Sequence, residues 1–307
     1  MNPHRFLDHY TVAAGALLAG RRTFFSRGVR CPAFDEVLEA TRLQLPDVTG
    51  EGTYEVPAET LVGTLDPAFL IAQWVGPERP TLIYHHGNNE RPFDFGPFSK
   101  NTFKQVVLSR REAFGANMIA LRAPFHRSLR TYMQRMTELR NFSAMLAVSV
   151  GLVEALVQWS RTQGSPQVIL TGASLGGWVT NLHRAHYNTA DRYAPMMAGA
   201  ALDEVFTTSS YRRLTGALAR ERPQALRDAL NFEAAFAAVP DDNVAALLMR
   251  YDAIIEYERQ RRCYDPARVT VLDRGHTTGA LDAAALRAFL LAQFKSEDAT
   301  SGDQRGT

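Results

Sequence analysis

Residues 167–178, QVILTGASLGGW, constrain the fold of this chain more than any other segment. The run 168–170 is short, continuously apolar and contains two β-branched residues, so it predicts a strand buried on both faces. The segment after it favours a helix, which places Ser174 on the tight turn between the two elements. Gly172 and Gly176 would let strand and helix approach closely, because glycine has no side chain. Such a turn projects the serine above the sheet edge, at the positive end of the helix dipole.

The rest of the chain alternates apolar runs with helical segments. Runs between residues 54 and 75, including Thr60–Thr64, are separated by Pro57 and by an Asp-Pro pair, which predicts short antiparallel strands. Later runs are each followed by a helical stretch, which predicts a mostly parallel, doubly wound α/β sheet. These strands are expected at 81–84, 117–122, 168–170, 193–201, 244–249 and 268–272, with helices over 103–114 and 142–159 and a C-terminal helix that buries Leu281 and Leu286.

Composition excludes several classes of protein. The 307 residues, 46% of them hydrophobic, can form one large domain, and we expect a single domain over 1–307. With 34 basic and 32 acidic residues, the chain lacks the basic excess that a nucleic-acid interface needs. Two cysteines, Cys31 and Cys263, are too few for a disulfide framework, so we expect a reducing, cytoplasmic location.

The two ends of the chain carry weaker patterns. The apolar run 12–20 is shorter than the roughly 20 residues of a membrane span. Asp8 precedes it and two arginines follow at once, which argues against a signal peptide. We therefore expect an N-terminal helix lying on the domain and no membrane span. Residues 295–307 are polar and are expected to be disordered. Nothing in the pattern indicates an oligomeric state.

The segment 172–176, Gly-Ala-Ser-Leu-Gly, resembles the nucleophile elbow of the α/β-hydrolase superfamily. An apolar strand before it, a helix after it and a third glycine at Gly177 strengthen the likeness. The resemblance implies an α/β-hydrolase fold and a serine hydrolase that acts on a small acyl substrate. It also implies that the charged, Ala-rich and strand-free segment 206–240 is a helical lid insertion.

The end of the strand at 81–84 also resembles a part of this family. It runs into His85-His86-Gly87, and a strand that ends in His-Gly is similar to the family's oxyanion loop. The resemblance implies that the backbone N–H groups of Asn88 and Leu175 bind the substrate oxygen. Two fixed N–H groups would stabilise the negative charge of a tetrahedral intermediate without reorganising.

A serine hydroxyl needs a base in hydrogen-bond reach, and the base needs an anion that fixes its tautomer. Ser174 is the candidate nucleophile. His276 is the candidate base, because it follows the last predicted strand in a Gly-His turn. Asp252, at the end of the strand before, is the candidate acid, and the order Ser, Asp, His is the order of the family. Three other carboxylates remain open as the acid: Asp203, Glu256 and Asp265.

Other kinds of chemistry have less support in the sequence. Adjacent His85 and His86 point apart in a strand, and His183 and His186 share a helix face without a carboxylate motif, so no metal site is predicted. No phosphate-binding glycine motif follows a strand, and no cofactor is predicted. We predict a serine hydrolase of an ester or thioester. A peptidase or amidase of the same fold, or a catalytically silent binding protein, are the alternatives.

Overall fold

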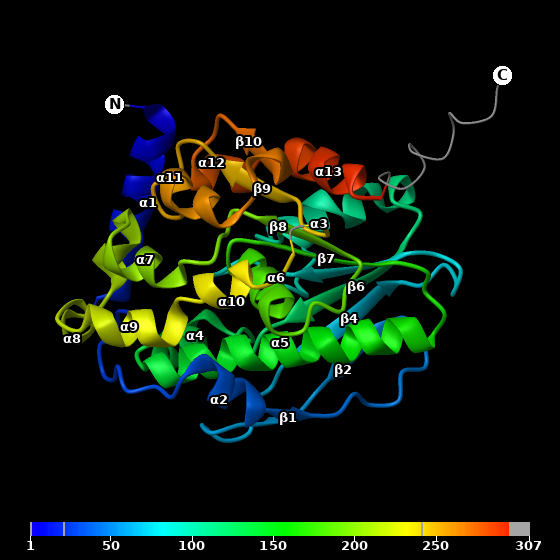
Figure 1. Ribbon diagram of the computed structural model, residues 1–307, viewed down its shortest axis with the longest axis horizontal. Coiled ribbons are helices and arrows are strands. Elements are labelled where there is room, and N and C mark those ends of the chain that lie inside the picture. Colours follow the sequence, from blue (N-terminus) through cyan, green and yellow to red (C-terminus); the bar gives the residue numbers. More distant parts are fainter. Residues whose placement is uncertain (1, 21, 241, 295–307) are drawn as a thin grey trace.

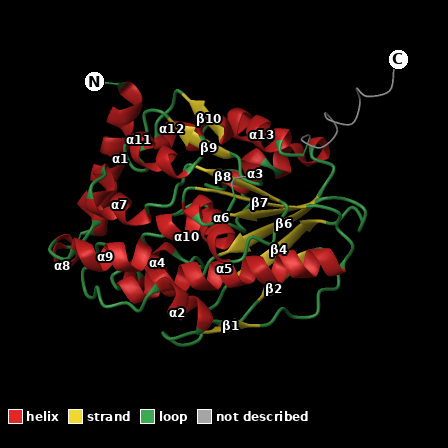
Figure 2. Cartoon of the chain, viewed as in Figure 1, coloured by secondary structure: helices red, strands yellow, loops and turns green. Residues whose placement is uncertain are grey.

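An eight-stranded sheet forms the centre of the molecule (Figures 1 and 2). The computed structural model describes residues 2–20, 22–240 and 242–294, so the disorder predicted for 295–307 lies outside the described residues. The strand order is β10-β9-β8-β7-β5-β6-β4-β2. The strands are β2 (Gly52–Glu55), β4 (Ala68–Gln73), β5 (Thr81–His85), β6 (Asn117–Arg122), β7 (Val168–Ala173), β8 (Arg192–Met196), β9 (Ala246–Met249) and β10 (Val269–Leu272).

The sheet is parallel from β6 to β10 and antiparallel only at one edge. There β2 pairs antiparallel with β4, and β4 pairs antiparallel with β6. Two very short strands, β1 (Arg42–Leu43) and β3 (Ala58–Glu59), form a separate antiparallel pair. Parallel strands buried on both faces read as continuous apolar runs, and β5, β6, β7 and β9 are buried along their whole length. The predicted mostly parallel α/β sheet is confirmed.

Helices cover both faces of the sheet, and the strand order explains why. Strand β6 lies on one side of β5 in the sheet, and β7 lies on the other side. The connections from β5 to β6 and from β6 to β7 therefore run in opposite directions across the sheet. Because both crossovers are right-handed, the helices between these strands lie on opposite faces. Figure 1 accordingly shows α3 and α13 on one side of the sheet and the long α5 on the other. The helices around the sheet are α2 (Phe34–Glu39), α3 (Thr102–Val106), α4 (Leu129–Arg135), α5 (Leu139–Thr162), α6 (Leu175–His186), α12 (His276–Ala280) and α13 (Ala283–Ala292).

Helix α5 is long and apolar enough to span a membrane by length and composition alone. Within the fold, however, 72% of its most apolar window is buried. It packs against α2 and α6, and its buried face is the one predicted from the helical spacing over 142–159. This burial is what a core helix of the domain requires.

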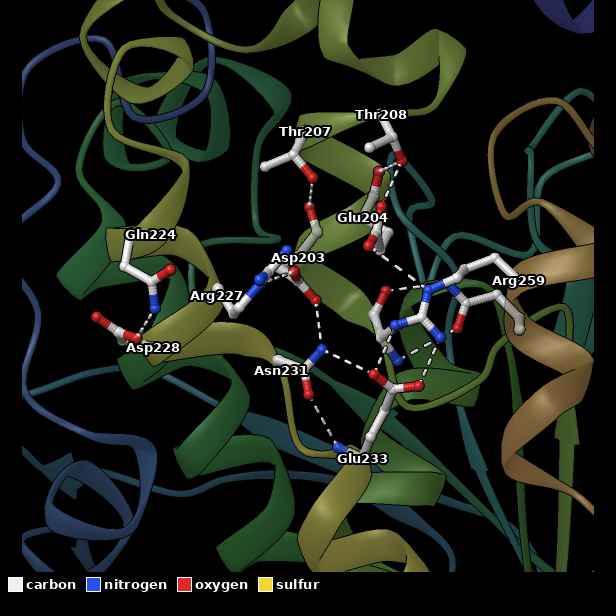
Figure 3. Close-up of polar contacts among 12 residues, drawn as sticks. Asp203, Glu204, Thr207, Thr208, Gln224, Arg227, Asp228, Asn231, Glu233 and Arg259 are labelled. Atoms are coloured by element: carbon white, nitrogen blue, oxygen red, sulfur yellow. Dashed lines mark hydrogen bonds and ion pairs between the residues drawn. The ribbon is translucent and has the colours of Figure 1, made fainter.

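The chain between β8 and β9 is helical, as the sequence predicts, and it contains no strand among the residues that the structure describes there. A polar network in this segment joins it to α11 (Figure 3). The guanidinium of Arg259 binds both carboxylate oxygens of Glu233 at 2.6 Å, and Asn231 donates to both Glu233 and Asp203. The elements here are α7 (Leu202–Thr207), η2 (Ser210–Leu214), α8 (Ala217–Arg220), α9 (Pro223–Leu230), α10 (Glu233–Ala237) and, after β9, α11 (Tyr257–Gln260).

Three local predictions were wrong. The helix expected over 103–114 is α3 followed by a 3₁₀ helix, η1 (Leu108–Ala113), and η1 itself is kinked at Arg110, which has non-helical backbone angles. Thr60–Thr64, expected as a strand, is a turn in which the Thr60 hydroxyl donates to the Gly63 carbonyl. Leu281 is 69% exposed, since it lies in the break between α12 and α13.

Candidate active site

Ser174 lies on a strained turn between β7 and helix α6. Its φ is +54°, a backbone conformation that a residue with a side chain rarely adopts. The turn is possible because the strand and helix nearly touch. A Cβ added at Gly176 would lie 2.1 Å from the carbonyl oxygen of His85, and one at Gly172 would lie 2.6 Å from the same atom. Both positions therefore need glycine, and the strand–turn–helix predicted from the sequence is present.

His276 and Asp252 are brought together from two different loops. Asp252 follows β9 and is 3% exposed, and His276 begins α12. The Oδ2 atom of Asp252 lies 2.8 Å from Nδ1 of His276. The other oxygen, Oδ1, accepts the backbone N–H groups of Ile254 and Ile255. A carboxylate bonded to Nδ1 leaves Nε2 as the nitrogen that can exchange a proton with a substrate or nucleophile.

The electrostatics of this pair favour a charged imidazole. Burial lowers the pKa of His276, but the negative charge of Asp252 and its hydrogen bond outweigh that effect. Asp8 adds a further, smaller contribution, and the pKa of His276 is raised above its ordinary value. Asp252 thus stabilises the imidazolium that a general base forms when it takes a proton.

The other candidate acids lie elsewhere. The buried carboxylate of Asp203 accepts from Asn231 at 2.9 Å and pairs with Arg227 (Figure 3), and burial raises its pKa. Two further carboxylates have their own partners: Glu256 pairs with Arg5, and Asp265 caps η4 (Pro266–Arg268). Of the four carboxylates named from the sequence, Asp252 is the one that contacts His276.

A cavity of about 500 Å³ opens beside these residues. Ser174, His276, Asn88 and Leu175 all line it, so the structure brings together the candidate nucleophile, base and oxyanion-loop residues. Most of the remaining wall is apolar and comes from α1 (Pro3–Ala19), α5 and the segment after β8. The apolar lining residues include Val12, Phe24, Phe142, Trp178, Leu202, Val205, Phe206, Leu214, Ile254 and Ile255.

The loop that carries Asn88 is held by a carboxylate that the sequence analysis did not single out. Glu90 accepts the Gly87 N–H at 3.0 Å and the Thr102 N–H at 2.9 Å, which joins the loop to the start of α3. Burial raises the pKa of Glu90. The side-chain amide of Asn88 donates to the hydroxyl of Tyr211, in η2. The loop is therefore fixed from both sides, and an acidic residue three positions after the glycine was the available clue.

The histidines near this loop form an uncharged cluster. His85, His86 and His126 are buried with their rings in contact, and burial lowers the pKa of His85 to about 3 and that of His126 to about 4. The His86 ring accepts the backbone N–H of Ala123. Within the described part of the chain, no group of three or more histidine, cysteine or acidic side chains is placed to hold a metal ion.

The sheet order and the glycine-flanked turn at Ser174 define a class of structure, the α/β-hydrolase fold. Residues 110–262 match the sequence model of the family described as alpha/beta hydrolase domain containing 18, a stretch that includes Ser174 and Asp252 and ends before His276. No curated protein matches the chain.

Solved structures share the fold at low sequence identity. Acetyl xylan esterase 1 from Thermoanaerobacterium sp. JW/SL YS485 is 13% identical, with a TM-score of 0.54 over 89% of this chain and 97% of the esterase. Acylaminoacyl peptidase from Pyrococcus horikoshii is 11% identical, also with a TM-score of 0.54, over 81% of this chain. The alignment spans only 41% of the peptidase chain.

Proposed function

We propose that this protein is a serine hydrolase that cleaves a carboxylic ester or thioester through an acyl-enzyme. The observation that carries the proposal is the arrangement of Ser174, His276 and Asp252. Ser174 and His276 line one cavity, and the Nδ1 atom of His276 is bonded to a buried carboxylate. In the proposed reaction, His276 takes the proton of the Ser174 hydroxyl while its oxygen attacks the acyl carbonyl.

The rest of the reaction follows the same residues. His276 gives its proton to the leaving alcohol or thiol, which departs as the acyl-enzyme forms. Water, deprotonated by His276, then attacks the acyl-enzyme and releases the acid, and the proton returns to Ser174. The backbone N–H groups of Asn88 and Leu175 would bind the oxyanion of each tetrahedral intermediate. Leu175 is the first residue of α6, and the first N–H groups of a helix have no partner within the helix.

The apolar wall of the cavity supports an apolar acyl group as the substrate part that binds there. We propose that the segment 206–240 acts as a lid, because Phe206, Tyr211 and Leu214 from its beginning line the cavity. Such a lid would exclude water from the acyl-enzyme and limit the length of the acyl chain. A peptidase or amidase activity is the second candidate, since an acylaminoacyl peptidase is among the proteins of similar fold.

Turnover of p-nitrophenyl esters of increasing chain length, by wild type and by Ser174→Ala, tests the proposal. We expect hydrolysis by wild type and its loss in Ser174→Ala, with a chain-length optimum that the cavity sets. Ser149→Ala is a matched control, because Ser149 is a buried serine on α5 away from the cavity.

The matching p-nitroanilides separate the two activities. Anilide turnover that depends on Ser174 in the absence of ester turnover would identify an amidase. If neither substrate reacts, a fluorophosphonate label decides between a narrow specificity and a silent fold. Labelling that persists in Ser174→Ala would disprove the mechanism.

A further inference from the structure

Helix α1 buries a carboxylate against the two loops that carry His276 and Asp252. Asp8 is 0% exposed, although it lies on the first helix of the chain. Its Oδ2 atom accepts the backbone N–H of His276 at 2.8 Å and that of Ala253 at 3.1 Å. Its Oδ1 atom accepts the N–H of Thr277 at 2.8 Å. Both oxygens of this buried carboxylate are therefore satisfied by backbone donors, as an ionised group in this environment requires.

These donors come from two separate loops. Ala253 directly follows Asp252, and the other two N–H groups belong to His276 and its neighbour Thr277. One side chain thus bridges the loop after β9 and the loop after β10. The bridge fixes the backbone on both sides of the hydrogen bond between Asp252 and His276, which is 2.8 Å long. A misplacement of about 1 Å in an active site can cost on the order of 100-fold in rate.

The surrounding contacts show that α1 is closely docked at this point. A Cβ at Gly275 would lie 2.8 Å from Oδ2 of Asp8 and 2.9 Å from the carbonyl oxygen of His4, so glycine is needed for the approach. The ring of His4 bonds to the hydroxyl of Thr278 at 2.9 Å and stacks on Tyr251. Figure 1 shows α1 running beside α12.

We propose that Asp8 is a positioning residue for the proposed Ser174–His276 chemistry. It holds the acid loop and the base loop at a fixed separation, and it places a second negative charge behind His276. The inference rests on the proposed hydrolase function. Asp8 touches neither the substrate nor Ser174 in this role, because its oxygens are occupied by the three backbone N–H groups.

The charges around residues 275–278 set the expected effect of removing this carboxylate. Negative charge comes from Asp252 and from Asp8, and the ring of His4 bonds to Thr278. Arg274, on the other side, pairs with Asp282 at 3.2 Å. Loss of the Asp8 charge therefore removes one of two anions that favour the imidazolium of His276, so the pKa of that ring should fall.

Asp8→Asn tests the proposal, because it keeps the shape of the side chain and removes the charge and one acceptor. We expect kcat on a p-nitrophenyl ester to fall about 10- to 100-fold with a smaller change in KM. We also expect the acid limb of the pH profile to move to lower pH. Asp191→Asn is the matched control, since Asp191 accepts the Val168 N–H at the opposite end of β7 from Ser174. This control should leave the acid limb in place.

A titration of His276 by NMR, assigned with His276→Gln, keeps the test independent of turnover. A lower pKa for His276 in Asp8→Asn supports the proposed role of Asp8 even if wild type hydrolyses none of the esters. In that case the proposed esterase function is wrong, and the role of Asp8 stands. Wild-type kcat together with an unchanged pKa of His276 would overturn it. If Asp8→Asn does not fold, Asp8→Glu replaces it. That variant keeps the charge and shifts the loops, so we expect a lower kcat with an unmoved acid limb. Wild-type kcat in Asp8→Glu would equally overturn the proposal.

Discussion

Substitution of Gly176 by alanine tests how the turn at Ser174 is built. Gly176 is the second residue of α6, and its added Cβ would lie 2.1 Å from the carbonyl oxygen and 2.7 Å from the carbonyl carbon of His85. The obstacle is the backbone of β5, which cannot rotate away as a side chain can. To reach an ordinary contact of 3.4 Å, helix and strand must separate by about 1 Å. That movement would carry Ser174 away from the loop that holds Asn88.

The magnitude follows from two opposing effects. Overpacking of a core costs about 1–3 kcal/mol and sometimes more, whereas glycine to alanine within a helix gains up to about 1 kcal/mol. We expect a net loss of about 2 kcal/mol in the free energy of unfolding for Gly176→Ala. Gly151→Ala, in α5, is the matched control. Its Cβ would meet only the Leu43 and Thr41 side chains at 3.6 and 3.9 Å, so this variant should gain up to about 1 kcal/mol.

Urea unfolding measures the change in stability, and ester turnover measures the effect of the displaced turn on catalysis. At equal m-values, the midpoints of the two variants should shift in opposite directions and differ by about 3 kcal/mol in stability. The kcat of Gly176→Ala should fall at least 10-fold, while that of Gly151→Ala stays at the wild-type value. If Gly176→Ala matches Gly151→Ala in stability and in kcat, the close contact of α6 with β5 does not determine the geometry of the turn.

Three further predictions concern the acid, the base and the histidine cluster. Asp252→Asn should lower kcat on the order of 10³- to 10⁴-fold, whereas Asp203→Asn should retain turnover; the opposite result in ester kinetics would assign the acid to Asp203. The pKa of His276 is raised, and the imidazole must be neutral to act as a base. We therefore expect kcat/KM to decline as pH falls, with a midpoint above about 6.5. A midpoint below that value would contradict the assignment of His276 as the base. Burial lowers the pKa of His126 to about 4, so its contribution to stability is full above about 6.5 and is lost as pH falls toward 4. At pH 5 this loss of stability is about 2 kcal/mol. Between pH 7 and pH 5, the melting temperature of His126→Gln should therefore decline less than that of wild type. Equal declines would exclude His126 as a cause of the loss of stability.

The parts of the fold that were predictable are those in which local sequence decides. The strands of the parallel sheet are apolar runs because both faces are covered, and a run such as 168–170 carries that information alone. The elbow was visible because the close contact at Gly172 and Gly176 excludes every other residue. The side-by-side placement of His276 and Asp252 followed from parallel topology, since both lie at the carboxyl ends of neighbouring strands.

The features that were not predictable depend on contacts between distant segments. Asp8 gave no local pattern, because its partners lie about 245 to 269 residues further along the chain. In sequence it was only a charge before an apolar run. The helix expected over 103–114 ends at Val106 and is kinked again at Arg110, although the arginines and apolar residues there are compatible with an unbroken helix. Tertiary packing outweighs local propensity at such positions.

The docking of α1 also determines at which stage of synthesis the candidate site can be completed. Asp8 leaves the ribosome 268 residues before its partner His276. At a synthesis rate of about 5–20 residues per second, this delay is on the order of 15–50 s. During that time the carboxylate of Asp8 lacks the backbone N–H groups that it binds in the folded protein. We therefore expect nascent chains to stay unreactive toward a fluorophosphonate until the segment around His276 has emerged. Labelling of stalled chains that end before residue 253 would disprove this order. The first helix is thus among the last pieces of the candidate site to settle.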